Sequence, residues 1–337
     1  MKQEAFVARH HTEWEQFDDW LVARGDNVRR ARRSAEIPAL RDSEVPERYR
    51  RLCQHLALAR RRGYSAQVTG RLQGLMQRGH AVLYRTPAPR WWRVATFFIA
   101  GFPRLVRAQA GCMLVAAAML YVPALLIFAA IQWRPELATA LLSPEQLAGY
   151  ERMYDASDPM RRLGRDNGTD VAMFGFYILN NISIGFRAFA SGLLAGVGSM
   201  VVLFVNGVMI GGVAGHLQAV GQGDPFWRFV AGHSAFELTA FVIAGGAGLQ
   251  LGLRLVAPGR LRRIDALVEG GRRGALLCAG VFVMLVMAAF VEAFWSSIGW
   301  IPAWIKYGVA AVLWAGVALW LLRSGRGRLP DDAGPWA

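Results

Sequence analysis

The sequence predicts an all-α membrane protein, a polytopic bundle of six transmembrane helices that follows an N-terminal cytoplasmic helical region. The first observation is composition: 54% of the 337 residues are hydrophobic and only 18% are charged, which is too little charge to surround a soluble core of that size. The second is the placement of charge. Residues 1–107 hold 21 Lys and Arg against 10 Asp and Glu, so they carry most of the chain's net charge of +14. Charge and apolar mass thus lie in different segments, which disfavours a soluble enzyme. The three cysteines are too few for a disulfide-stapled module.

Residues 1–89 are expected to form a basic cytoplasmic region of short amphipathic helices. Apolar side chains from Val7 to Leu21 recur near one helical face. Two further amphipathic segments follow at about residues 45–62 and 65–84. The N-terminus has no apolar core or cleavage site of the signal-peptide kind, so this region is expected to stay in the cytoplasm.

Residues 90–107 mix aromatic and basic side chains, among them Trp91, Trp92, Arg93 and Arg104. Their uninterrupted apolar part is too short to cross a bilayer. The mixture is typical of an amphipathic helix at the anionic cytoplasmic surface of a membrane. A helix covered by the N-terminal bundle is an equally good interpretation.

The membrane domain is expected over residues 108–322, since a bilayer crossing takes about 20 apolar residues. The six predicted spans are residues 108–132, 171–191, 193–217, 229–256, 273–297 and 301–322. Residues 133–170 are then an extracytoplasmic loop, and residues 323–337 a cytoplasmic tail. Two crossings between 171 and 217, rather than one, place the later arginine clusters in the cytoplasm, as the positive-inside rule requires.

Glycines recur every fourth residue in two spans. Gly207, Gly211 and Gly215 form one ridge, and Gly248 and Gly252 another. Such ridges let helix backbones approach closely. They predict helix packing either within a tight bundle or across a homo-oligomer, such as a dimer.

Polar residues inside the spans are the candidate functional residues, because polar and ionisable groups are costly in a bilayer. The expected intramembrane polar cluster consists of Asn180, Asn181, Asn206, His216, His233, Glu237 and Glu292. At a rise of about 1.5 Å per residue, these residues fall in the outer half of the membrane.

Several interpretations of this cluster remain open. It can be an interhelical hydrogen-bond network, the proton or ion path of a channel or transporter, or a site for a lipid or polar ligand. His233 and Glu237 share a helix face at i,i+4, so they are also candidate metal ligands of a metal-binding protein or metalloenzyme. Their spacing differs from the zinc motif HExxH.

No catalytic residue is predicted, because the sequence contains neither a nucleophile elbow nor a phosphate-binding loop. Nucleotide hydrolysis is therefore not expected, and no cofactor is predicted. The basic charge is explained as an orientation signal with a contact to anionic lipid, so no nucleic-acid partner is expected.

The ordered motifs resemble the stage II sporulation protein M family of bacterial integral membrane proteins. The fragments that carry the resemblance include Phe102-Pro103-Arg104, Asn180-Asn181, Asn206-Gly207, His233-x-x-x-Glu237-Leu238, Ala244 to Leu249, Pro258-Gly259-Arg260 and Glu292-x-Phe294. Together with Phe6-Val7-Ala8-Arg9 and Trp14 near the start, they extend over nearly the whole chain.

The resemblance implies a non-enzymatic scaffold or assembly component of the cell envelope in the bacterial inner membrane. The charge distribution places both termini on the cytoplasmic side. In spore formers the family's namesake localises peptidoglycan-degrading partners during engulfment. Relatives in other bacteria suggest assembly of membrane complexes, often alongside a MoxR-type ATPase system. The implied partners are the lipid bilayer, other membrane or envelope proteins and further copies of the chain. Nothing in the sequence ties the chain to sporulation.

Overall fold

The structure is a computed structural model that describes residues 2–24, 40–41, 43–83, 90–155, 157, 162–165 and 168–326. Most of the expected C-terminal tail, residues 327–337, lies outside the described residues. The described part is helical and contains no β-strand. The chain divides into two compact units, Met1–Ala88 and Pro89–Ala337.

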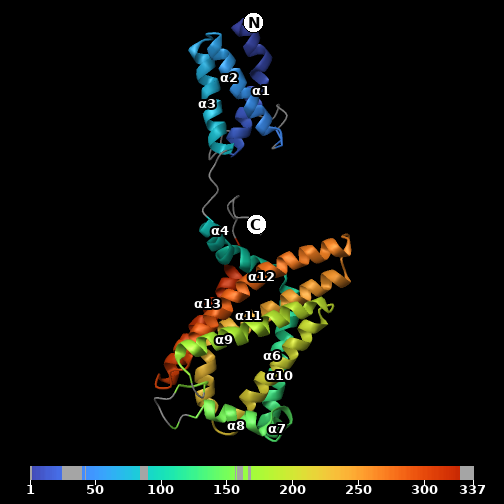
Figure 1. The fold of residues 1–337 in the computed structure, drawn as a ribbon, viewed down its shortest axis with the longest axis vertical. Helices are drawn as coiled ribbons and strands as arrows, with labels where there is room; N and C mark the ends of the chain where they lie inside the picture. The colour runs from blue at the N-terminus through green and yellow to red at the C-terminus, as the bar shows by residue number, and fades with distance from the viewer. Residues whose placement is uncertain are drawn as a thin grey trace. The chain divides into compact units, whose positions relative to one another are not determined.

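The first unit consists of three helices around a core of its own (Figure 1). They are α1 (Gln3–Arg24), α2 (Val45–Arg61) and α3 (Ala66–Leu83). A proline in the first turn of α2 and two arginines in its last turn suit the two ends of a helix. The buried core of the three-helix unit includes Phe6, Trp14, Phe17, Leu52, Leu56, Leu72 and Leu75.

The second unit begins with two short helices joined by a π-helical turn, where the sequence suggested one interfacial helix. The segments are α4 (Arg90–Thr96), η2 (Phe97–Gly101) and α5 (Phe102–Ala108). Phe102 is fully buried and stacks on Trp320 at 5.3 Å between ring centroids. Arg107 Nη2 donates to the carbonyl of Ser324 at 2.6 Å. The basic face therefore binds the carbonyl end of the last helix, where the helix dipole favours a cation.

The remaining long helices form the bundle of the second unit (Figure 1). They are α6 (Ala110–Trp133), α9 (Asp170–Ala190), α10 (Val197–Ala219), α11 (Gly223–Val256), α12 (Arg263–Val291) and α13 (Ala303–Arg323). Two short helices, α7 (Leu137–Leu141) and α8 (Pro144–Met153), lie between α6 and α9. The helix α12 continues as a π-helical turn, η4 (Glu292–Ser296).

Five of the described helices are long and apolar enough to cross a membrane: α6, α10, α11, α12 with η4, and α13. The helix α9 occupies the place of the second predicted span but is not among them. Its polar residues Asn180, Asn181, Ser183 and Arg187 lower its hydropathy. A sixth crossing by α9, which packs against α11 and α12, stays a prediction.

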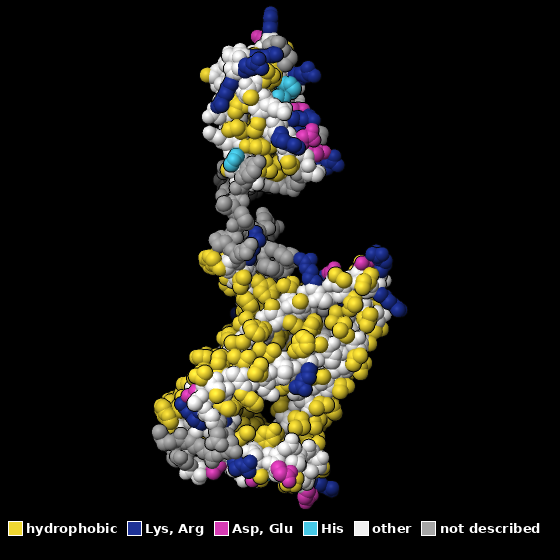
Figure 2. Space-filling view, viewed as in Figure 1, with side chains coloured by type: hydrophobic (Ala, Val, Ile, Leu, Met, Phe, Trp, Pro, Cys, Tyr) yellow, Lys and Arg dark blue, Asp and Glu magenta, His cyan; other side chains and the backbone are white. Residues whose placement is uncertain are grey.

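The helix α11 lies at the centre of the bundle, with 67% of its most apolar window buried against 17–44% for the other four candidate spans. The outer helices expose large hydrophobic side chains such as Leu114, Leu125 and Phe282. Figure 2 shows hydrophobic side chains over much of the visible face of this unit. An apolar exterior around a packed core is what a bilayer requires.

The glycine ridges are used within the chain. A Cβ on Gly207 would lie 2.3 Å from the carbonyl oxygen of Leu120, and one on Gly211 would lie 2.3 Å from that of Ala124. A Cβ on Gly215 would lie 3.0 Å from Ile131 Cβ. The first ridge therefore packs α10 against α6.

The second ridge packs α11 against the turn between α9 and α10. A Cβ on Gly248 would lie 2.2 Å from Ser199 Oγ, and one on Gly252 would lie 2.0 Å from the backbone nitrogen of Gly196. All five ridge glycines therefore pack against other parts of the same chain. This is the first of the two arrangements that the ridges predicted, helix packing within a tight bundle.

Candidate functional site

Three ionisable side chains of the predicted polar cluster meet inside the bundle. His233 and Glu237 come from α11, and Glu292 comes from η4. His233 Nε2 lies 3.6 Å from Glu237 Oε2. One ligand atom from each of the three residues lies within 4.8 Å of the others. The three groups thus form one compact site, to which α9 adds Asn181 beside Glu292.

Helix geometry explains how these side chains come together. The i,i+4 spacing places His233 and Glu237 on one face of α11. The π-helical turn η4 changes the rotation per residue at the end of α12, and such turns are frequent at functional sites. It presents both Glu292 and Ser296 to α11, and Ser296 Oγ lies 3.2 Å from His233 Nδ1.

The site is buried and its hydrogen bonding is incomplete. His233 is 5% exposed, Glu292 8% and Asn181 2%. Among the described residues, Glu292 Oε2 and Asn181 Nδ2 have no hydrogen-bond partner. Two carboxylates this close repel each other strongly away from water, so they require a proton or a cation to share.

A buried lysine, which was not predicted from the sequence, lies next to the site. Lys306, on α13, is fully buried and its Nζ donates to the backbone carbonyl of Ser296 at 2.7 Å. Ser296 therefore links the imidazole of His233 to Lys306. The signal in the sequence was that Lys306 is the only charged residue between positions 301 and 322.

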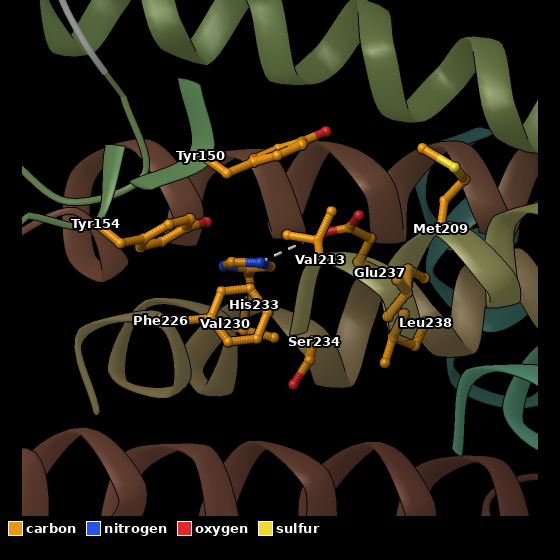
Figure 3. Close-up of a pocket in the computed structure, with 11 residues that line it drawn as sticks. Tyr150, Tyr154, Met209, Val213, Phe226, Val230, His233, Ser234, Glu237 and Leu238 are labelled. Atoms are coloured by element: carbon orange, nitrogen blue, oxygen red, sulfur yellow. Dashed lines mark ion pairs between the residues drawn. The ribbon is translucent and has the colours of Figure 1, made fainter. Parts of the chain in front are cut away.

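A cavity of about 290 Å³ reaches the site from one side. His233, Ser234 and Glu237 line it from α11, and Tyr150 and Tyr154 lie across from them (Figure 3). Burial, and then the charge of Glu292, raise the pKa of the Tyr154 phenol well above its usual range. Tyr154 therefore keeps its proton and presents a neutral hydroxyl.

Comparison with known proteins places the fold and this site in a family. Residues 110–297, more than half of the chain, match the family described as stage II sporulation protein M. The chain belongs to the stage II sporulation protein M family. The matched segment contains the whole His233–Glu237–Glu292 site, whereas Lys306 lies beyond it.

The N-terminal unit of this stage II sporulation protein M family member matches a different family. Residues 4–85 correspond to a domain of unknown function, DUF8413. No curated protein and no solved structure matches the chain significantly.

The other residues of the predicted cluster lie outside the His233–Glu237–Glu292 site. His216 Nε2 lies 2.7 Å from Glu151 Oε1 and so connects α10 to α8. Asn206 Nδ2 donates to the carbonyl of Val202 in its own helix at 2.7 Å. Asn180 is exposed and donates to Asn181 Oδ1 at 3.1 Å. The cluster is therefore smaller than the sequence suggested.

Proposed function

We propose that the chain is a non-enzymatic scaffold of a cell-envelope complex in the bacterial inner membrane, with both termini in the cytoplasm. The observation that carries the proposal is the pairing of a separately cored three-helix unit with a close-packed membrane bundle. Such an arrangement suits a chain that holds partners together across a membrane. The role need not be specific to sporulation, because nothing in the chain is tied to that process.

The orientation follows from the distribution of arginine. The connection between α11 and α12 carries Arg260, Arg262 and Arg263, while Arg104 and Arg107 stand before α6. The positive-inside rule assigns both groups to the cytoplasm when α9 and α10 cross as a pair. The cavity beside His233, on the α8 side of the bundle, then opens on the extracytoplasmic side.

The first unit has the character of a protein-binding module. Its acidic side chains on α1 pair with arginines of the neighbouring helices: Arg48 Nη1 lies 2.8 Å from Glu13 Oε1, and Arg78 Nη2 lies 2.7 Å from Asp18 Oδ1. These pairs neutralise part of the basic surface and speak against a phosphate-binding face. A groove of about 640 Å³ lies between α1 and α3, and the apolar side chains of Val7 and Val68 are among those that line it. We assign this groove to a cytoplasmic partner protein.

The close packing of α11 argues against the alternative of a channel or transporter. Gly248 and Gly252 bring the α11 backbone against the turn between α9 and α10. Conduction along that face of α11 would require these elements to separate. The five ridge glycines pack within the chain, so a homo-oligomer would have to use another surface, and it stays a prediction.

Site-specific photo-crosslinking in native membranes tests the scaffold. A photoreactive residue at Gln67, in the groove, is expected to give a discrete adduct with a second, cytoplasmic protein identifiable by mass spectrometry. The matched position Gln54, exposed on α2 outside the groove, should not give that adduct. Adducts of equal yield at both positions, or none at either, would refute the assignment.

Proteoliposomes provide the complementary measurement. The wild-type protein should catalyse no proton or cation flux above that of empty liposomes. Flux that is lost in Glu237→Gln while the variant remains folded would replace the scaffold with a transporter.

A further inference from the structure

We propose that His233, Glu237 and Glu292 bind one divalent transition-metal ion, with water from the adjacent cavity completing its coordination. The inference goes beyond the scaffold function and does not depend on it. A metal-binding scaffold and a metal-binding transporter are equally compatible with the geometry.

The geometry suits a metal after small side-chain movements. Donor atoms bound to one metal at about 2.1 Å lie about 3–4 Å apart. Here His233 Nε2 and Glu237 Oε2 are 3.6 Å apart, and all three donors lie within 4.8 Å of one another. Side-chain shifts of about 1 Å thus bring Glu292 into range.

Unpaired atoms point to a missing cation rather than to a finished hydrogen-bond network. Glu292 is buried and belongs to the donor set, and in the described part of the chain its Oε2 has no hydrogen-bond partner although Asn181 lies beside the carboxyl group. A structural network would satisfy that atom, because a buried carboxylate oxygen without a partner is costly. A divalent ion would neutralise both carboxylates together.

Lys306 does not serve as their counter-ion. Its Nζ donates to the carbonyl of Ser296, and no ion pair joins it to Glu237 or Glu292 among the residues that the structure describes. The charge of the two carboxylates is therefore left for a shared proton or another cation.

The donor set selects the class of metal. One imidazole nitrogen with two carboxylates suits Zn²⁺, Mn²⁺, Fe²⁺ or Co²⁺, whereas Ca²⁺ and Mg²⁺ prefer all-oxygen sites. Ser296 Oγ contacts His233 Nδ1 and so orients the other ring nitrogen toward the carboxylates, as outer partners of metal-binding histidines do. The cavity of about 290 Å³ has room for water at the open positions.

A second group, His10, Glu13 and His55 in the first unit, has comparable spacing but a different environment. Glu13 is held by Arg48 at 2.8 Å, and His55 Nδ1 accepts a hydrogen bond from Trp14 Nε1 at 3.1 Å. The arginine cation and the occupied ring nitrogen disfavour a metal there, yet any test has to separate the two groups.

The test uses the full chain in detergent, purified with a tag that lacks histidine and stripped with a chelator. Titration with Co²⁺ should give d–d absorption bands that saturate at about one ion per chain, with the metal content confirmed by elemental analysis. Loss of a ligand should weaken binding by about 100-fold or more in Glu292→Gln and in His233→Gln. The matched control His55→Gln should bind as the wild type does.

The thermal unfolding of metal-free protein distinguishes a metal site from a structural network. Glu292→Gln leaves a single carboxyl group in the metal-free site, so its unfolding midpoint should equal or exceed that of metal-free wild type. If Glu292→Gln does not fold, Glu237→Gln provides the same comparison with the metal-free wild type. The proposal is overturned if the wild type binds no stoichiometric Co²⁺, if binding survives both glutamine variants, or if His55→Gln abolishes it.

Discussion

Single glycines control how closely the membrane helices approach. A Cβ on Gly252 would lie 2.0 Å from the backbone nitrogen of Gly196, which cannot move without displacing the turn between α9 and α10. Gly316 on α13 has nothing within 4 Å of its Cβ position. Both glycines lie in apolar helices, but only Gly252 belongs to a predicted ridge, and the packing agrees with that difference.

We expect Gly252→Ala to lower the free energy of unfolding by about 1–3 kcal/mol, since overpacking forces the backbone apart. Gly316→Ala should be neutral or slightly stabilising, because alanine favours a helix more than glycine does. Thermal unfolding in detergent, followed by circular dichroism, measures both. Equal midpoints for the two variants would show that the α11 contact is looser than the structure indicates.

His55 makes the first unit sensitive to pH. Burial, and then repulsion from His10, lower the pKa of His55, against a smaller opposite effect of Glu13. The unfolded chain therefore binds the proton more readily than the folded unit does. The stability that neutral His55 contributes is fully present above its ordinary pKa of about 6.5 and is lost as the pH falls below that value.

Hydrogen exchange of the full-length protein can follow this effect. After correction for intrinsic rates, peptides from α1 and α2 should be less protected at about pH 5 than at about pH 7.5. His55→Gln, which does not titrate, should reduce the difference. Protection in the wild type that stays constant or rises toward pH 5 would contradict the assignment.

At the scale of elements, α8 packs on the bundle through apolar side chains and one ion pair. Ser143 and Gln146 form a capping box at its start, and His216 pairs with Glu151 near its end. Tyr150 and Tyr154 extend from this segment over the cavity. The ion pair therefore helps to fix one wall of the candidate site.

Glu151→Gln should loosen α8 without unfolding the bundle. Because the Glu151 side chain is 41% exposed, the pair contributes at most about 1 kcal/mol. Amides of residues 144–153 should exchange several-fold faster, while those of α11 keep their protection. A Glu136→Gln control, in the same connection but outside this ion pair, should leave α8 unchanged. Unaltered exchange of α8 in Glu151→Gln would exclude the anchoring role.

Helix positions in this chain could be predicted well from the sequence, because they depend on local hydropathy and periodicity. The places of α6, α10, α11, α12 and α13 follow from long apolar runs. The π-helical turns at Phe97–Gly101 and Glu292–Ser296 could not be predicted, since they depend on how a helix end packs.

At the scale of the whole molecule, the candidate site could be predicted only in part. His233 and Glu237 share a face by spacing alone, and the burial of Glu292 follows from its place in an apolar run. His216 was misplaced because its partner, Glu151, lies 65 residues earlier in a connection with no periodic signal. Lys306 was missed because its contact with Ser296 exists only after α13 has docked.

The proposed orientation requires α9 and α10 to cross the membrane as a pair. The cavity then opens on the side opposite the cytoplasm. Single-cysteine labelling measures this directly, in a background where Cys53, Cys112 and Cys278 are replaced by alanine. In intact spheroplasts, an impermeant thiol reagent should label Glu145→Cys on α8. It should label Arg260→Cys, between α11 and α12, only after permeabilisation. Labelling of Arg260→Cys in intact spheroplasts would mean that α9 does not cross, and would contradict the orientation on which the proposed function rests.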